Sequence, residues 1–231
     1  MKKIFIIIVS AFLCIGLMQA QLPELTKKEK KDGWKLLFDG KTSVGWKHYR
    51  GGPFPEKGWK IENGELIVDP AGKGGDIITE EEFSDFELSI DFKITQGANS
   101  GIKYFILPGT NLGCEFQILD DANHPDAKMG KDGNRLQAGL YDLIAPQGKK
   151  DKPIGKWNNA RIISKGTHVE HWINGKKVVS FERGSDAFKA LIAGSKYKDN
   201  ANFSTPAKAP ILLQDHADVV SFRNIKIRIL E

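Results

Sequence analysis

The chain has 231 residues, of which 34 are Lys or Arg and 29 are Asp or Glu, so its formal charge is +5. Acidic and basic residues are interleaved throughout, and this mild excess of positive charge argues against a nucleic-acid partner. A chain of this length can bury an adequate hydrophobic core without disulfides. Of its two cysteines, Cys14 lies in the N-terminal apolar run described next, so we expect Cys114 to remain unpaired.

The first twenty residues have the pattern of an export signal. Lys2 and Lys3 precede an apolar run over residues 4–17, and the small residue Ala20 ends an acceptable cleavage site. The apolar run is shorter than the roughly 20 residues that a transmembrane helix needs. We therefore expect residues 1–20 to be a cleaved signal peptide, with no membrane span and a periplasmic or secreted location.

Residues 21–33 are interpreted as a lead-in segment, in which the charged run 27–32 forms a solvated helix capped by Thr26. Composition shows no internal repeat, low-complexity segment or long linker after this point. Residues 34–231 are therefore expected to form a single domain.

Most of that domain has the periodicity of β-strands. Apolar and polar residues alternate over residues 86–95, as in a strand with one buried face. The pairs Asn63-Gly64 and Asn174-Gly175 each separate two short apolar runs, which is typical of type I′ hairpin turns. Further strands are expected at residues 34–38, 59–61, 66–68, 101–107, 114–119, 136–143, 157–164, 169–173, 176–181, 211–214 and 219–230. Only residues 186–193, after Ser185 as a cap, predict a short helix.

A dozen short strands with hairpins and no alternation of strands with helices indicate an all-β fold. The expected architecture is an antiparallel two-sheet β-sandwich of the jelly-roll kind. Such a fold has solvent-facing strand positions, and these are where a polar site would lie.

Three strand-like stretches carry a histidine together with carboxylates or amides, at residues 115–124, 170–172 and 214–216. A strand with such residues either faces water or lines a site, and a solvated face is the common outcome for any single stretch. Three stretches of similar chemistry favour a site, since histidine suits proton transfer and metal ligation near neutral pH. The sequence therefore predicts a polar, catalytic concave surface.

An ordered set of motifs makes the chain resemble a known family. The motifs are WKLLFDG at 34–40, NSGIKY at 99–104, GCEFQILDD at 113–121, LYDLIAP at 140–146, VEHWING at 169–175, LQDH at 213–216 and FRNIKIR at 222–228. They resemble the 3-keto-disaccharide hydrolase domain, formerly called DUF1080, over nearly the whole chain after residue 33. The common family form has Tyr where this chain has Phe116, a change expected to alter packing more than chemistry.

The resemblance implies a concanavalin A-like lectin/glucanase sandwich from glycan-degrading bacteria, acting on an oligosaccharide or glycoside oxidised at C3. A ketone at C3 acidifies the hydrogen at C2, so a base can remove it and the C1 oxygen can leave by β-elimination, after which water adds. This reaction needs a general base, a group that stabilises the oxyanion, and an acid for the leaving group. No cofactor is certain, although a divalent metal ion would serve as a Lewis acid.

The candidate residues fall into three groups. The catalytic candidates are Glu115, Asp120, His171 and His216. The substrate-binding candidates are Lys103, Gln117, Tyr141, Lys196, Gln214 and Arg223. The metal-ligand candidates are Asp121, His124 and Asp215, although no His-x-x-x-His or Cys-x-x-Cys spacing supports a metal.

Each group has a structural alternative. Glu115 and Gln117 share one strand face, which could simply be solvated. His171 shares a face with Val169 and Ile173 and could be a hydrogen-bonded core histidine. The acids after residue 119 could cap a turn, Arg223 could form a structural ion pair, and the two lysines could only aid solubility. The loop 126–135 could close over the site.

Two other functions remain open at this stage. The same fold supports non-catalytic carbohydrate-binding modules, because fold does not fix function. A conventional glycoside hydrolase of this fold would require two carboxylates facing each other at about 5 to 10 Å.

Overall fold

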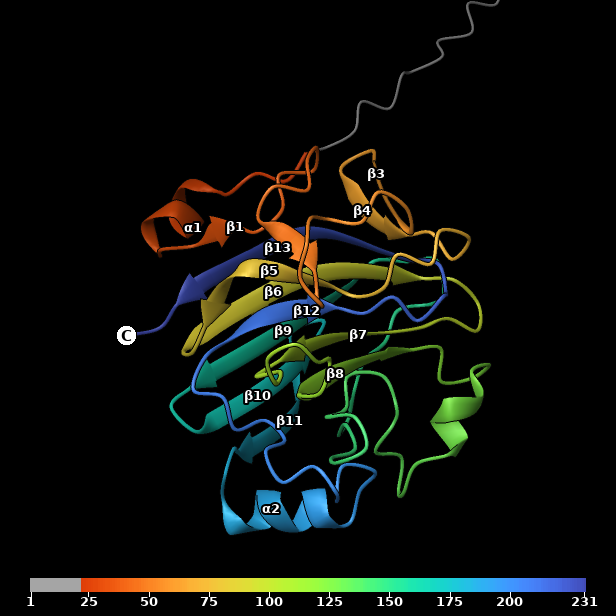
Figure 1. The fold of residues 1–231 in the computed structure, drawn as a ribbon, viewed down its shortest axis with the longest axis vertical. Helices are drawn as coiled ribbons and strands as arrows, with labels where there is room; N and C mark the ends of the chain where they lie inside the picture. The colour runs from red at the N-terminus through yellow and green to blue at the C-terminus, as the bar shows by residue number, and fades with distance from the viewer. Residues whose placement is uncertain (1–21) are drawn as a thin grey trace, which may run out of the picture.

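A computed structural model describes residues 22–231 as two antiparallel sheets packed face to face (Figure 1). The expected signal peptide lies outside the described residues. Among residues 22–231, no helix has the length and apolar character needed to cross a membrane. The two-sheet antiparallel β-sandwich expected from the sequence is confirmed.

The helices are α1 (Lys27–Lys31) and α2 (Asp186–Ala193), with one 3₁₀ turn at Pro125–Lys128. The strands are β1 (Lys35–Leu36), β2 (Trp46–His48), β3 (Trp59–Glu62), β4 (Glu65–Val68), β5 (Ile77–Phe83), β6 (Phe86–Ile94), β7 (Asn99–Tyr104), β8 (Cys114–Leu119), β9 (Asn158–Lys165), β10 (His168–Ile173), β11 (Lys176–Glu182), β12 (Ala209–Leu213) and β13 (Val220–Ile229).

The larger sheet has eight strands in the order β11-β10-β9-β6-β13-β4-β3, and β1 pairs with the part of β13 that β4 leaves free. The smaller sheet has five strands in the order β2-β5-β12-β7-β8. Strands far apart in sequence thus become neighbours, as β12 does between β5 and β7. This arrangement brings β7, β8 and the end of β12 together at one edge of the smaller sheet.

The core lies between the two sheets and is made of alternate residues from each strand. Phe92 of β6 and Phe116 of β8 are fully buried, and their ring centroids lie 6.4 Å apart across the core. Burial of such aromatic side chains is the main favourable term in folding, at about 25 cal/mol per Å² of apolar surface. The opposite face of each sheet is left for other contacts.

The local expectations about turns and helices are confirmed. Asn63 and Gly64 have φ of 54° and 77°, and Asn174 and Gly175 have φ of 48° and 78°, as type I′ turns require. The Ser185 side chain accepts a hydrogen bond from the amide of Phe188 at the start of α2. Thr26 caps α1 in the same way with a capping box.

One expected strand is absent, and two observed strands were not predicted. Residues 136–143 form turns rather than a strand, and two of them, Ala138 and Asp142, have φ of 70° and 63°, outside the β region of backbone conformation. Only Leu140 makes isolated bridges there, to Phe116 and Ile144. The sequence also failed to predict β2 and β5, because β5 places three glutamates in a row and so has no clear alternation.

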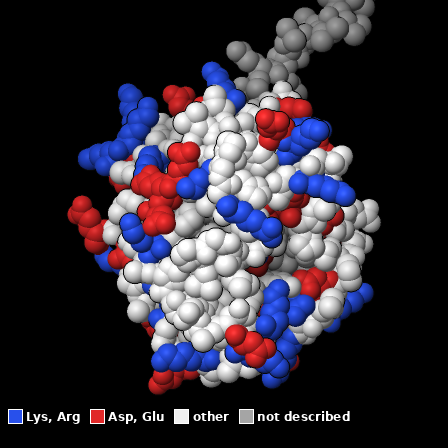
Figure 2. All heavy atoms as spheres, in the orientation of Figure 1, with Lys and Arg blue, Asp and Glu red and all other residues white. Residues whose placement is uncertain are grey.

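Positive and negative side chains are intermixed over the face of the molecule shown in Figure 2, with broad uncharged areas between them. This distribution matches the interleaving of acids and bases along the chain.

Candidate active site

A small pocket of about 70 Å³ lies on the outer face of the five-stranded sheet, over β7 and β8. Its lining residues are Asn99, Lys103, Glu115, Gln117, Tyr141, Lys196, Gln214 and His216. Seven of these eight were candidates from the sequence. The structure therefore gathers most of the expected polar residues at one place, which is called the polar pocket below.

Strand alternation explains why these side chains meet. Glu115 and Gln117 point outward, while Phe116 between them points into the core. The register places Lys103 of β7 opposite Glu115 and Gly101 opposite Gln117. Carboxylate, amine and amide thus share one outer face, as the sequence predicted for Glu115 and Gln117.

Gly101 leaves the space that the carboxylate occupies. A Cβ atom at this position would lie 2.1 Å from Glu115 Oε1, which no real structure tolerates without movement. A glycine in a strand interior weakens the strand, and close approach of another group is a common reason for one. The motif Asn99-Ser100-Gly101 therefore makes room for the acid on the next strand.

The carboxyl group of Glu115 is buried, with the residue only 4% exposed. Burial raises its pKa, and the nearby charge of Asp76 adds to this, although the amines of Lys103 and Lys196 act in the opposite direction. Lys103 Nζ lies 3.5 Å from Glu115 Oε2. A carboxyl with a raised pKa in a pocket has the property expected of a general base or acid that works near neutral pH.

The amide of Gln117 links Glu115 to Asn99. One end of this amide lies 3.2 Å from the Asn99 side chain. The other end lies 3.3 Å from Glu115 Oε1 and 3.2 Å from the Ser100 carbonyl, so with its nitrogen placed there the amide donates to both oxygens. Glu115 is thereby held in one orientation.

Lys196 and Tyr141 come from loops that cover the edge of the sheet. Lys196 Nζ lies 4.1 Å from the centroid of the Tyr141 ring, a cation–π arrangement. Although Lys196 is exposed as a residue, desolvation of its amine lowers its pKa, with the charge of Glu115 opposing the change. The amine is thus less strongly hydrated than a free surface lysine.

A network of ion pairs fixes these loops. Arg135 pairs with Asp126 at 2.7 Å and with Asp142 at 2.6 Å. The Tyr141 hydroxyl donates to Asp126 at 2.8 Å, and the backbone amide of Lys196 donates to Asp142 at 2.8 Å. The loop 126–135 therefore anchors two residues of the polar pocket, which is a supporting contact that the sequence did not predict.

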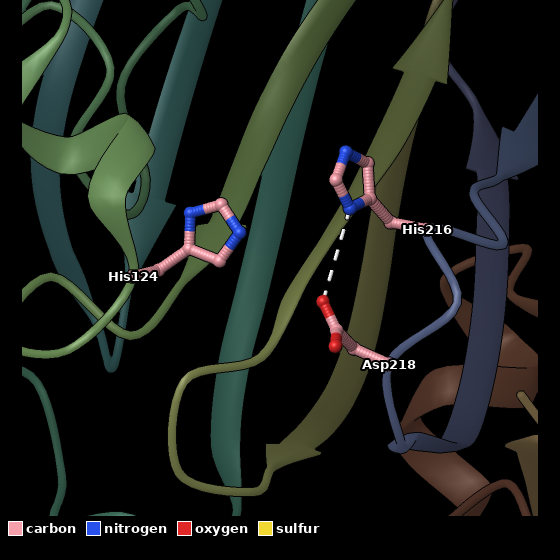
Figure 3. A group of neighbouring side chains, drawn as sticks. All are labelled: His124, His216 and Asp218. Atoms are coloured by element: carbon pink, nitrogen blue, oxygen red, sulfur yellow. Dashed lines mark ion pairs between the residues drawn. The ribbon is translucent and has the colours of Figure 1, made fainter.

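A possible metal site lies beside the polar pocket. His124, His216 and Asp218 each offer one ligand atom, and these atoms lie within 4.8 Å of one another (Figure 3). His124 follows β8, whereas the other two lie between β12 and β13. His124 Nδ1 accepts a hydrogen bond from the amide of Asp126, which leaves Nε2 free to bind. His216 also borders the polar pocket, where its Nε2 lies 3.5 Å from the Asn99 amide.

Asp121 and Asp215, the other two metal candidates, have different partners. Asp121 pairs with Lys149 and accepts from the amide of Gln137. Asp215 accepts from the amides of Gly75 and Ala217. Of the three metal candidates, only His124 belongs to the histidine and aspartate group.

His171 lies in the core and not in the polar pocket. Its ring is fully buried, with Nε2 2.6 Å from the Tyr104 hydroxyl and Nδ1 3.2 Å from the Ala138 carbonyl. Burial lowers its pKa to about 4, although hydrogen bonds to backbone carbonyls oppose this. His171 is therefore a hydrogen-bonded core histidine, which is the structural alternative that the sequence left open.

Asp120 and Arg223 also lie outside the polar pocket. Asp120 caps the turn after β8, accepting from the amides of Gly97, Ala122 and Asn123. Arg223 lies on the outer face of the eight-stranded sheet, over the Trp157 ring and 3.7 Å from Asp91. A bulge between Arg223 and Lys226 shifts the alternation of β13 by one residue, so the odd-numbered face that the sequence suggested is interrupted there.

Three residues near the site, Asn99, Asp218 and Asp76, were not assigned a function from the sequence. Asn99 stood in a quoted motif, and Asp218 follows His216 at a His-x-Asp spacing that could have suggested a shared ligand set. Asp76 is buried and accepts from the Asp215 amide and the Asn111 side chain. No local pattern distinguishes Asp76 from other acids at a strand start.

The fold and the polar pocket together define a β-sandwich protein with a buried acid between amines on the outer face of one sheet. The model of the 3-keto-alpha-glucoside-1,2-lyase-like domain matches residues 33–228. The chain belongs to this family, which is the family that the motifs resembled.

Similar proteins agree with this assignment. A 3-keto-disaccharide hydrolase of Bacteroides thetaiotaomicron is 34% identical, over 94% of this chain and 85% of the relative. A crystal structure of a putative glycosyl hydrolase from Parabacteroides distasonis is 32% identical with a TM-score of 0.82, over 91% of this chain and all of the other. A second such structure from that organism has 27% identity and a TM-score of 0.63, over 85% of this chain and 99% of the other.

Proposed function

We propose that this protein is a glycan-degrading enzyme that cleaves the glycosidic bond of glycosides oxidised at C3. The observation that carries the proposal is the buried carboxyl of Glu115, with its raised pKa, beside Lys103 and Lys196 in the polar pocket. The relative from Bacteroides thetaiotaomicron, named a 3-keto-disaccharide hydrolase, supports the substrate class.

In the proposed mechanism Glu115 takes the proton from C2 of the sugar. The electron pair of the C2–H bond forms an enolate with the C3 carbonyl, whose negative oxygen faces the Lys196 amine. The enolate then expels the C1 oxygen, which takes a proton from Lys103, and leaves a C1–C2 double bond beside the restored ketone. Water adds at C1 and a proton returns to C2, so the net reaction is hydrolysis.

Two features of the polar pocket favour this chemistry over the alternatives. A retaining or inverting glycoside hydrolase needs two facing carboxylates, whereas Glu115 is the only carboxylate among the pocket-lining residues within the described part of the chain. A binding module needs aromatic platforms and amides, and has no use for a buried acid that is costly to desolvate.

The group of His124, His216 and Asp218 extends the proposal to a divalent cation. Two imidazoles and one carboxylate suit a transition metal or zinc better than magnesium or calcium, which prefer oxygen ligands. A cation held there would act as a Lewis acid toward sugar oxygens. The proposal leaves out His171, Asp120 and Arg223, because none of them reaches the polar pocket.

The test compares 3-keto-glucosides with the same glucosides before oxidation. We expect cleavage only of the oxidised form, because only the ketone acidifies the hydrogen at C2. In D₂O, deuterium should appear at C2 of the product, as measured by NMR or mass spectrometry. Equal turnover of the two forms, or product without deuterium at C2, would contradict the elimination mechanism.

A further inference from the structure

A buried carboxylate, that of Asp76, lies close to the polar pocket without lining it. Asp76 precedes β5 and is 5% exposed. Its Oδ1 accepts a hydrogen bond from the backbone amide of Asp215 at 2.9 Å, and its Oδ2 accepts one from the Asn111 side chain at 3.0 Å. Both donors are neutral amides, and burial of a carboxylate on neutral partners is costly. A role in the neighbouring site would account for such a residue.

Asn111 connects Asp76 to Lys103. It belongs to the loop between β7 and β8, and its side chain donates to Asp76 while its backbone carbonyl accepts from Lys103 Nζ at 3.3 Å. Lys103 Nζ also lies 3.5 Å from Glu115 Oε2. An ammonium group has three N–H bonds, so these two partners leave one for the polar pocket, which Lys103 lines. The position of the Asn111 carbonyl thus decides where the Lys103 amine points.

Asp76 lies two strands away from Lys103 in the five-stranded sheet. Leu213 of β12 pairs with Ile77, which follows Asp76, and with Ile102, which precedes Lys103. Two strand spacings of about 4.8 Å amount to roughly 10 Å. The loop between β7 and β8 bridges this distance with a side-chain contact at one end and a carbonyl contact at the other. Asp76 can therefore act on the Lys103 amine through this loop.

We propose that Asp76 is a positioning residue for the proposed reaction and acts through Asn111 on Lys103. By fixing the Asn111 side chain, Asp76 holds the carbonyl of the same residue against the Lys103 amine. The remaining N–H bond of this amine then faces the oxygen that leaves C1. The inference rests on the proposed function, in which Lys103 protonates that oxygen, and it adds two residues that touch no substrate.

The dependence of the rate on the leaving group tests this inference. Methanol is a poor leaving group and needs a proton from an acid as the C1–O bond breaks, whereas 4-nitrophenolate leaves without one. The experiment measures kcat/KM for the 3-keto forms of methyl glucoside and 4-nitrophenyl glucoside. A residue that acts through Lys103 should matter for the methyl substrate alone, whereas a general disturbance of the polar pocket should lower both values.

Asn111→Ala breaks the contact with Asp76 and keeps the backbone carbonyl. We expect kcat/KM to fall by about tenfold for the methyl substrate and by less than about twofold for the 4-nitrophenyl substrate, since a misplaced acid loses part of its contribution. Asp76→Ala should lower the ratio of the methyl value to the 4-nitrophenyl value in the same way. Glu82→Gln changes an exposed carboxylate near the other end of β5 and should leave both values unaffected.

The same change in a Lys103→Met background separates an action through Lys103 from a structural one. Lys103→Met by itself should cause a larger selective loss with the methyl substrate than Asn111→Ala does. Adding Asn111→Ala to Lys103→Met should then change neither value by more than about twofold, because the group through which Asn111 acts is already gone. All assays are run below the melting midpoint of each variant.

If Asn111→Ala lowers both values equally, or lowers them further in the Lys103→Met background, the inference is wrong while the proposed cleavage of oxidised glycosides stands. The same holds if Asp76→Ala leaves the ratio unchanged. The inference also fails if Lys103→Met shows no selective loss, because Lys103 is then not the acid. If the wild type cleaves neither 3-keto-glucoside, the proposed function fails and the inference with it.

Discussion

The outer faces of the two sheets each carry a strand glutamate, and the two glutamates behave in opposite ways. Glu170 of β10 accepts hydrogen bonds from Lys177 and from the Trp172 indole, each at 2.8 Å. Burial alone would raise its pKa, but these hydrogen bonds lower it. For Glu115 of β8, burial outweighs the attraction of Lys103, and its pKa is raised.

Coverage by loops accounts for the difference. On the eight-stranded sheet, charges and aromatic rings lie flat on the strands, as Arg161 does 5.2 Å from the centroid of the Trp172 ring. On the five-stranded sheet, Tyr141 and Lys196 reach over β8 from loops and shield Glu115 from water. The comparison of the two sheets indicates when a polar strand face becomes a candidate site. Other segments must remove it from water without fully pairing its charges.

The largest expected effect comes from exchanging the two glutamates for glutamines. Glu115→Gln should lower kcat/KM for a 3-keto-glucoside by roughly a thousandfold, the contribution of a positioned general base. Glu170→Gln should leave kcat/KM within about twofold, since Glu170 lies on the other sheet and does not line the polar pocket. Turnover assays and melting curves of both variants check this comparison. Similar losses in the two variants would mean that Glu115 has no special role.

The next prediction concerns His171, between the two sheets. Its pKa of about 4 in the folded protein is below the usual value of 6.5. Between these values the unfolded chain binds more protons at this site than the folded chain, so the free energy of unfolding should fall by about 3 kcal/mol from pH 7 to pH 4. Urea unfolding at several pH values measures this, and His171→Phe should flatten that part of the profile.

His168 provides a control of opposite sign for the same measurement. Hydrogen bonds that His168 donates to the carboxylates of Glu182 and Glu170 raise its pKa in the folded protein. Its contribution to stability is therefore present at low pH and is lost as the pH rises through the raised pKa. His168→Gln should leave the acid-side loss of stability in place. If His171→Phe and His168→Gln give the same profile of stability against pH, His171 is not the source of the loss of stability at acidic pH.

A smaller effect is expected in metal binding. Titration calorimetry with Mn²⁺ or Zn²⁺ should detect one site, and His124→Ala or Asp218→Asn should each weaken it by more than about tenfold, because each removes a ligand. His168→Ala is the matched control, since this histidine lies among carboxylates on the other sheet and should not matter. Unchanged binding in all three variants would place the metal elsewhere.

The smallest effect is a shift in the pKa of Glu115 itself. Lys103→Met removes a positive charge that lowers this pKa, so the pKa should rise. Asp76→Asn removes a negative charge that raises it, so the pKa should fall. A ¹³C NMR titration of the Glu115 carboxyl measures both shifts without relying on activity. Shifts in the same direction would show that structural change, not charge, dominates.

The sequence by itself determined much of the local structure. The residue pattern predicted β6 at residues 86–95 and β8 at residues 114–119. A period of two is a property of any extended strand with one buried face. The same rule placed Glu115 and Gln117 on one face. Ser185 and the two Asn-Gly pairs predicted the start of α2 and two hairpins, because capping and turn geometry depend on neighbouring residues alone.

The sequence could not tell which polar strand positions would be covered. His171 and His216 both stand in motifs with carboxylates, yet one is enclosed between the sheets and the other borders the polar pocket. The bulge in β13 turned Arg223 toward the outer face, and left-handed backbone at Ala138 replaced an expected strand. Each of these outcomes depends on which strands pair and which loops pack on them.

Only the tertiary structure brought His124 to His216, since β8 and β12 flank β7 in the five-stranded sheet, run in the same direction and so end at the same edge. Only the register placed Lys103 beside Glu115 and left room for the carboxylate over Gly101. The electrostatic properties of the site follow from these long-range contacts, because desolvation and charge pairing act through space between side chains whatever their separation along the chain.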